Sequence, residues 1–281
     1  MGKLLSEAQI RFYHENGYLF PIRVLSEDEA LAYRRRLEAA ERLGHPRTAQ
    51  FLRTKAHLVY TFCDELVRHP KILDAVEDII GPDILCWSSG FFNKEAKDPA
   101  YVSYHQDLTY WGLEPDDIVT AWVALSPATP ESGCMKFLPG SHKSEILPHK
   151  DTFAPENLLS RGQEVQVEVD ESKIVFDVLR PGEMSLHHVK LIHGSDPNRS
   201  DDRRIGFVIR YVPTYVRQVV GKIDSATLVR GVDRYGHFEP ERRPRADLDP
   251  EAIAHYDEVT ERLNRVLFRG TDRVREQSPA T

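Results

Sequence analysis

The sequence has few cysteines, no long apolar run and no excess of basic residues, and each absence excludes a class of protein. Cys63, Cys86 and Cys134 are an odd number at wide spacing without a CxxC motif, which argues against a disulfide framework or a cysteine zinc site. No apolar run approaches the ~20 residues of a membrane-spanning helix, and the N-terminus lacks a signal-peptide core. With 37 basic and 44 acidic residues, the net charge of −7 argues against nucleic acid and membrane surfaces as partners. We therefore expect a cytoplasmic protein with reduced thiols and, at this size, an enzyme.

Helix signals concentrate at the two ends of the chain. Capping-box patterns begin at Ser6 and at Ser26, and each predicts the start of an α-helix. Pro70 opens a third amphipathic segment at a position where proline suits the first helical turn. Near the C-terminus, Asp249 precedes Pro250 and an apolar stripe at helical spacing. We expect a helical N-terminal part over about 1–82.

The middle of the chain has the pattern of short strands. Segments rich in β-branched and aromatic residues alternate with turn formers, which favours an antiparallel sandwich or barrel over βαβ units. The connection 139–163 is too polar and proline-rich to contain strands. We expect one mainly β domain, with a core over about 83–215 and a C-terminal extension with a helix over 216–281. The predicted strands are 84–92, 101–106, 118–125, 134–138, 164–169, 173–178, 183–189 and 204–212.

A candidate metal site lies in this β region. In an extended strand, residues two apart point to the same face, so His105 and Asp107 would present an imidazole and a carboxylate side by side. Iron(II) oxygenases bind their metal through two histidines and one carboxylate, which leaves positions for co-substrate and dioxygen. His193 is the candidate for the second histidine, on a facing strand.

A candidate anion site follows the second histidine. Arg204 opens the last strong strand, and the turn formers before it place it and His193 on neighbouring strands of a predicted hairpin. A guanidinium can hold a carboxylate through two parallel hydrogen bonds, and Ser195 could bond the same group. Arg203 is the alternative, since adjacent side chains on a strand point to opposite faces.

These residues resemble those of the phytanoyl-CoA dioxygenase family of Fe(II)/2-oxoglutarate oxygenases. The resemblance covers most of the chain and rests on LSEAQIRFYHENGYL, YHQDLTYW, FLPGSH and HGSDPNRSDDRRIGFVIRY. It implies a double-stranded β-helix (jelly-roll, cupin-like) core with flanking α-helices. It also implies Fe(II), 2-oxoglutarate and O2 as cofactors, and hydroxylation coupled to the release of succinate and CO2. By resemblance, the iron ligands are His105, Asp107 and His193, and the residues that bind 2-oxoglutarate are Arg204, Ser195, Trp111 and Trp122. Because related halogenases replace the metal-binding carboxylate, Asp107 favours hydroxylation.

The sequence gives weaker signals about the substrate. His187 and His188 are adjacent on a predicted strand, so one of them faces the interior and could orient a metal ligand. Charged side chains in a strand-rich core need partners, and an anionic substrate would provide one. The substrate candidates are Trp87, Ser89, Asn93, Lys94, Tyr104, Gln106, Tyr110, Arg210 and Tyr211.

The stretch from Trp87 to Leu113 is more similar to small-molecule hydroxylases of the family than to its acyl-CoA enzymes. We therefore expect a small, anionic substrate, first an aminoalkylphosphonate such as 2-aminoethylphosphonate or its N-methylated form. A free or carrier-bound amino acid or a secondary metabolite is the alternative within the same chemistry. A cupin-like metal-dependent isomerase or hydrolase, or a non-catalytic β-barrel binding protein, are alternatives of other classes. A monomer or a homodimer is compatible with the sequence.

Overall fold

The protein is built around two β-sheets. The computed structural model describes residues 2–221 and 223–271. Its strands are β1 (Tyr18–Arg23), β2 (Ile84–Phe91), β3 (Val102–His105), β4 (Leu113–Glu114), β5 (Val119–Ala124), β6 (Met135–Phe137), β7 (His149–Asp151), β8 (Gln163–Val165), β9 (Val175–Phe176), β10 (Glu183–His188), β11 (His193–Ser195), β12 (Gly206–Pro213), β13 (Arg217–Gln218), β14 (Ser225–Arg230) and β15 (Glu239–Pro240). The seven-stranded sheet has the order β1-β10-β5-β12-β2-β14-β15, and the four-stranded sheet has the order β3-β11-β6-β9. β13 pairs with β4, and β7 pairs with β8. This is the jelly-roll core that the sequence predicts.

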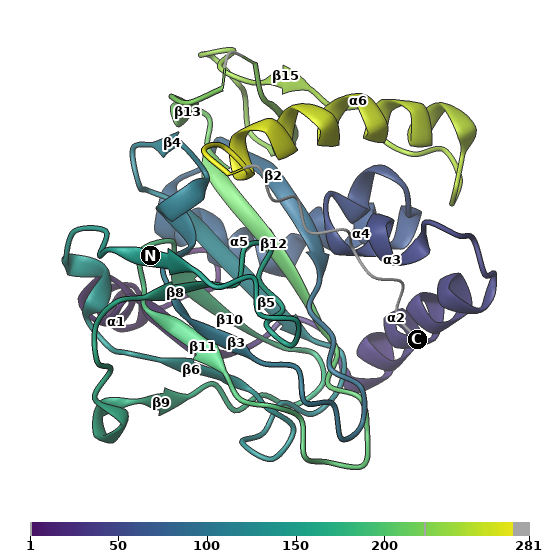
Figure 1. Ribbon diagram of the computed structural model, residues 1–281. Coiled ribbons are helices and arrows are strands. Elements are labelled where there is room, and N and C mark those ends of the chain that lie inside the picture. Colours follow the sequence, from purple (N-terminus) through teal and green to yellow (C-terminus); the bar gives the residue numbers. More distant parts are fainter. Residues whose placement is uncertain (1, 222, 272–281) are drawn as a thin grey trace.

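Helices support the large sheet from outside. They are α1 (Glu7–Asn16), α2 (Glu27–Arg42), α3 (Thr48–Arg53), α4 (Thr61–Val67), α5 (Pro70–Ile80) and α6 (Pro250–Leu267), with 3-10 turns η1 (Ala56–Leu58), η2 (Asp107–Tyr110), η3 (Ser141–Lys143) and η4 (Glu171–Lys173). Both predicted capping boxes are present, at Ser6 and at Ser26, and Asp249 caps α6. Figure 1 shows α2, α3, α4 and α6 gathered on the side of the molecule away from the four-stranded sheet.

The two faces of the large sheet differ because side chains alternate along each strand. The outer residues of β5, Val119, Ala121 and Val123, belong to a large apolar cluster with residues of α2, α4 and α5. Thr120 and Trp122 of the same strand face inward and line a cavity. The helices therefore bury one face of the sheet, and the other face remains available for a site.

Parts of the predicted topology are wrong. β11 pairs with β3 and β6, whereas β12, which follows Arg204, pairs with β2 and β5, so the predicted hairpin of His193 and Arg204 does not form. Arg204 itself forms an isolated bridge with Lys94. The segment before residue 83 contains an edge strand, β1, and the segment 139–163 contains β7. β14 adds a further strand beyond residue 215. These strands are short or lie far in sequence from their partners, and tertiary pairing determines them.

A β-bulge shapes the centre of the sheet. Arg210 pairs with Ser88 and Tyr211 pairs with Cys86, so Trp87 is the extra residue on β2. As a result, Trp87 and Ser88 both line the cavity, and Ser89 faces the helices. The Trp87 carbonyl accepts a hydrogen bond from Lys55 Nζ at 2.6 Å.

Candidate iron and co-substrate site

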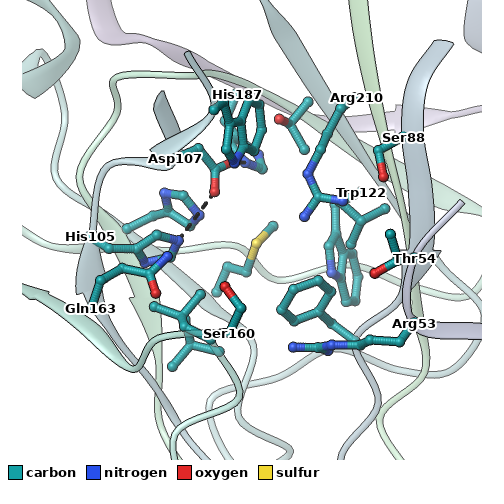
Figure 2. A pocket seen from close by; sticks show the side chains of 18 of the residues that line it. Arg53, Thr54, Ser88, His105, Asp107, Trp122, Ser160, Gln163, His187 and Arg210 are labelled. Carbon is teal, nitrogen blue, oxygen red and sulfur yellow. Dashed lines mark ion pairs between the residues drawn. The ribbon is translucent and has the colours of Figure 1, made fainter. Parts of the chain in front are cut away.

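Three potential metal ligands converge at one end of the cavity. His105 ends β3 and His193 begins β11, and the two residues are register partners. Asp107 follows on η2, so its carboxylate comes from a 3-10 turn and not from the predicted strand. One donor atom of each residue lies within 4.8 Å of the others, and all three are buried. Figure 2 shows the contact between His105 and Asp107, at 3.3 Å between Nε2 and Oδ1.

Backbone contacts orient both imidazoles. Nδ1 of His105 lies 2.9 Å from the Ser103 carbonyl oxygen, and Nδ1 of His193 lies 2.9 Å from the Leu191 carbonyl oxygen. Because a carbonyl oxygen only accepts, each Nδ1 carries the proton, and each Nε2 keeps a lone pair for a metal. Burial and the neighbouring His105 lower the pKa of His193 to about 4, so its ring is neutral at pH 7.

The carboxylate completes the donor set. Burial acts to raise the pKa of Asp107, but the contacts with His105 and the nearby His193 outweigh it, so the pKa lies below its ordinary value. Asp107 is therefore ionised at neutral pH and offers a hard oxygen ligand. Fe(II) oxygenases bind their metal on one face through two imidazole nitrogens and one carboxylate oxygen. The residues present fit Fe(II).

Arg204 is a buried cation with unused hydrogen-bond donors. It is 1% exposed, and its Nε and Nη2 have no partner among the described residues. Burial lowers the pKa of Arg204 to about 10, so it stays charged at neutral pH. Its guanidinium lies over the Trp122 ring, 5.4 Å from the centroid. An unpaired buried guanidinium fits the far carboxylate of 2-oxoglutarate.

Ser195 and Lys94 lie beside Arg204. Lys94 Nζ donates a hydrogen bond to Ser195 Oγ at 2.6 Å, which leaves the serine proton free for an acceptor in the cavity. Burial and the charge of Arg204 lower the pKa of Lys94 to about 6. Arg203, the sequence alternative to Arg204, forms ion pairs with Glu41 and Glu95 outside the cavity. The structure thus places Arg204, and not Arg203, at the site.

All three tryptophans of the chain line the cavity. Trp87 and Trp111 pack together with ring centroids 4.9 Å apart, and Trp122 lies below Arg204. The space open to the centres of water molecules is about 130 Å³. This is well above the ~10–15 Å³ that the first water in a cavity needs, so the cavity has room for a small organic ligand.

The structure brings some of the predicted substrate residues into the cavity and leaves others outside. Trp87 and Arg210 line the cavity, and His187 does so too, while its neighbour His188 packs against His142. Lys94 lies behind Ser195, away from the lining. Ser89 bonds His57, because the bulge at Trp87 reverses the order of faces. The remaining residues outside the lining are Asn93, Tyr104, Gln106, Tyr110 and Tyr211.

These outlying residues have other surroundings. Tyr104 and Tyr110 donate hydrogen bonds to Glu171 and Asp151, and Tyr211 donates to the Val67 carbonyl. The remaining two also lie apart from the cavity: the Gln106 amide bonds backbone groups, and Asn93 keeps a buried oxygen without a partner among the described residues.

Several lining residues do not appear among the predicted site residues. Ser88, Thr120 and Met135 come from the sheets, and Leu263 and Leu267 come from α6. Thr120 lies two residues before Trp122 on one strand, so strand alternation could have identified it. Ser88 could not be found in this way, because the bulge is invisible in the sequence.

The jelly-roll fold, the two histidines with one carboxylate, and the unpaired arginine define an Fe(II)/2-oxoglutarate-dependent oxygenase. The chain belongs to the family described as Phytanoyl-CoA dioxygenase (PhyH), which matches residues 13–206. Its cofactors are Fe(II) and 2-oxoglutarate, with O2 as the oxidant. In the part of the chain that the structure describes, every helix is too short or too polar to cross a bilayer.

Similar proteins are known in sequence and in structure. The chain is 30% identical to "Probable alpha-ketoglutarate-dependent hypophosphite dioxygenase" of Stutzerimonas stutzeri over 65% of this chain and 60% of that protein. It is also 30% identical to "1-deoxypentalenic acid 11-beta-hydroxylase" of Streptomyces arenae over 70% of this chain and 76% of that protein. A solved "non-heme monooxygenase; ThoJ apo" has a TM-score of 0.82 at 34% identity, covering 92% of this chain and 97% of that one.

Proposed function

We propose that this oxygenase hydroxylates an unactivated C–H bond of a small, polar, anionic metabolite, with release of succinate and CO2. The first substrate to test is an aminoalkylphosphonate, such as 2-aminoethylphosphonate or its N-methylated form. The observation that carries the proposal is the state of Arg210. Its guanidinium projects into the cavity and makes no hydrogen bond or ion pair with any described residue.

The surroundings of Arg210 favour an anion. Its guanidinium carbon lies 5.3 Å from the Trp111 ring centroid and 5.8 Å from that of Phe92, and the carboxylate whose charge acts on it is Asp107, a potential metal ligand. Burial lowers the pKa of Arg210, which shows the cost of keeping this charge away from water. A ligand carboxylate or phosphonate would offset that cost.

The names of two relatives support an anionic substrate. Hypophosphite is a phosphorus oxyanion, and 1-deoxypentalenic acid is a carboxylic acid. The first name favours a phosphorus-containing group, whereas the second keeps a carboxylate, as in an amino acid or a secondary metabolite, as the alternative.

The residues of the chain would divide the reaction between them. Bound Fe(II) and 2-oxoglutarate supply the oxidising chemistry that converts O2 and 2-oxoglutarate to succinate, CO2 and the transferred hydroxyl group. His105, Asp107 and His193 would hold the metal. Arg204 and Ser195 would bind the far carboxylate of 2-oxoglutarate. The tryptophans and α6 would exclude water from the substrate.

Two measurements test the proposal. Anaerobic titration with Fe(II) and 2-oxoglutarate should give the weak visible charge-transfer band of the chelate, and Asp107→Ala should abolish it. Under air, 2-aminoethylphosphonate or its N-methylated form should raise succinate formation together with a hydroxylated product. If a panel of phosphonates gives neither succinate nor a hydroxylated product, this substrate class is excluded. The same assay with a panel of amino acids then tests the alternative.

We also propose that the chain acts as one catalytic unit, as a monomer or a homodimer in the cytoplasm. The support is that residues from Arg53 to Leu267 line a single cavity and that all three cysteines are free thiols. Size-exclusion chromatography with light scattering would give the oligomeric state.

A further inference from the structure

Four polar side chains form a continuous row across the inner face of the large sheet. His187 of β10 is the register partner of Thr120 on β5, which is also the partner of Arg210 on β12. Arg210 is in turn the partner of Ser88 on β2. All four line the cavity. We call these residues, His187, Thr120, Arg210 and Ser88, the polar row.

The polar row is short of partners. Both ring nitrogens of His187 and the Thr120 hydroxyl are buried without a hydrogen bond to any described residue. His187 and Thr120 are each 1% exposed and Ser88 is 4% exposed, and the Ser88 hydroxyl has no bond within residues 2–221 and 223–271 either. Buried polar atoms are normally paired, and an unpaired one is costly. Three neighbours in this state, together with the partly buried Arg210 between Thr120 and Ser88, indicate a place for a ligand.

The neighbouring positions on the same face are mostly apolar. The adjacent register line contains Trp122 and Val208, with Gly90 at the β2 end and Ser185, whose hydroxyl donates to Asp177, at the β10 end. On the opposite side lies an apolar cluster that includes Trp87, Trp111 and Val212. The polar row is therefore a narrow band of donors between apolar walls, which is the usual composition of a small-molecule site.

The order of the row determines what it can bind. Adjacent strands lie ~4.8 Å apart, so the register places Thr120 and Ser88 on the two sides of Arg210. A carboxylate is satisfied by two parallel bonds to a guanidinium. Two additional hydroxyl donors suit a group with a third oxygen, such as a phosphonate. Figure 2 shows Arg210 and Ser88 side by side at the cavity.

His187 marks the other end of the row. Both of its ring nitrogens are buried without a partner in the part of the chain that the structure describes, and a neutral imidazole accepts a hydrogen bond at one of its two nitrogens. His187 Nε2 lies 3.9 Å from Asp107 Oδ2. Figure 2 shows His187 next to Asp107, on the side of the metal ligands. A hydrogen-bond donor of the substrate placed here would lie close to the metal.

We propose that the polar row is the binding site for a short substrate with a phosphorus oxyanion at one end and an amine at the other. Arg210, Thr120 and Ser88 bind the three oxygens, and His187 accepts a hydrogen bond from the amine. This inference rests on the proposed function, because it specifies which groups select its substrate. It places the carbon atoms between the two groups over the middle of the row, between Arg210 and His187.

The experiment measures binding without turnover. The full chain is loaded anaerobically with Fe(II) and 2-oxoglutarate, and tryptophan fluorescence is followed, since all three tryptophans line the cavity. The probes are 2-aminoethylphosphonate, ethylphosphonate, which lacks the amine, and β-alanine, which has a carboxylate in place of the phosphonate. The chelate band shows that each variant is folded and loaded.

Each substitution has its own expected pattern. Arg210→Met should weaken binding of every probe about 10- to 100-fold. Thr120→Val and Ser88→Ala should each weaken both phosphonates about 3- to 10-fold and leave β-alanine unchanged. His187→Phe should weaken 2-aminoethylphosphonate about 10-fold and leave ethylphosphonate unchanged, and His187→Asn should recover part of this loss. Arg217→Gln, which removes an exposed arginine paired with Glu114, is the matched control and should change nothing.

The outcomes separate this inference from the proposed function. If no phosphonate binds, or if Thr120→Val and Ser88→Ala leave phosphonate binding unchanged, the assignment of the polar row is wrong. If His187→Phe weakens the binding of both phosphonates equally, His187 does not bind the amine. A phosphonate that binds through the row but yields no hydroxylated product under air supports the row and contradicts the proposed function. If a phosphonate is hydroxylated but its binding is unchanged by substitutions in the polar row, the proposed function is supported and the assignment of the row is contradicted.

Discussion

The two faces of the central sheet carry two buried polar clusters of opposite character. On the helix-covered face, Lys55 Nζ donates to Trp87 and Ser225 carbonyl oxygens and to Glu241, at 2.6, 2.9 and 2.5 Å. The same Glu241 carboxylate contacts His57 at 3.2 Å and accepts a hydrogen bond from Thr227 at 2.7 Å. On the cavity face, the polar row has almost no partners.

The difference separates a structural cluster from a binding site. All three ammonium protons of Lys55 are used, and burial would raise the pKa of Glu241 if the charge of Lys55 did not hold it below its ordinary value. The pair also satisfies the carbonyl at the bulge, which the sheet leaves without a ladder partner. Arg204 and the polar row, in contrast, have donors that only a ligand can satisfy.

The largest expected effect is on the structural cluster. Lys55→Met should lower the free energy of unfolding by about 3–5 kcal/mol, because it leaves the Glu241 carboxylate buried without its cation. Urea denaturation measures the loss. The double variant Lys55→Met with Glu241→Gln removes both charges and should recover part of the stability. If Lys55→Met alone is as stable as the parent, the cluster has no structural role.

Arg204→Gln should act on co-substrate binding and not on stability. Losing the charge-assisted hydrogen bonds should weaken 2-oxoglutarate binding by about 1.5–3 kcal/mol, which is roughly 10- to 150-fold. Anaerobic titration of the chelate band gives the affinity. Arg203→Gln, on the adjacent residue outside the cavity, is the control, and an equal loss there would contradict the assignment of Arg204.

Lys94→Met should give a smaller effect at the same end of the cavity. Without the hydrogen bond from Lys94, the Ser195 hydroxyl is no longer held in position, and 2-oxoglutarate affinity should fall by about 1 kcal/mol, or roughly 5-fold. The dependence of succinate formation on 2-oxoglutarate concentration should show a raised KM with little change in kcat. A large fall in kcat at unchanged KM would place Lys94 elsewhere in the reaction.

The smallest effect, and one of opposite sign, is expected at the polar row. Arg210→Met should leave the ligand-free protein as stable as the parent or more stable by about 1 kcal/mol, since it removes an unpaired charge from an apolar site. Thermal unfolding with and without a phosphonate measures this, and the ligand should stabilise only the parent. A marked destabilisation of the free variant would show that Arg210 has a structural role.

The sequence predicted most reliably what depends on neighbouring residues. The capping serines and the proline that begins α6 fix helix starts locally, and the structure confirms them. The spacing of His105 and Asp107 places two potential ligands together whether or not the strand continues. His193 and Arg204 were proposed from a hairpin that does not form, and the family resemblance gave them the same roles. Their pairing could not be found by local reasoning, because His193 lies in the four-stranded sheet and Arg204 precedes β12 of the other sheet.

What the sequence could not give depends on pairing between distant strands. Because of the bulge at Trp87, Ser88 faces the cavity and Ser89 faces the helices, the opposite of what strict alternation from Trp87 predicts. The bulge shows only in the pairing of β2 with β12. Which of His187 and His188 faces inward follows from the register of β10 on β5. The polar row itself is a property of four strands and has no signature in any one of them.

The cavity is closed by the last helix of the described chain. Leu263 and Leu267 of α6 line it, and Arg161 donates a hydrogen bond to the Leu267 carbonyl oxygen at 3.2 Å. Because a ribosome makes the chain from its N-terminus, the three potential iron ligands and Arg204 are synthesised before α6. The newly made chain therefore has its metal-binding residues before it has a wall to shield them, and assembly of the cavity waits until α6 has left the ribosome.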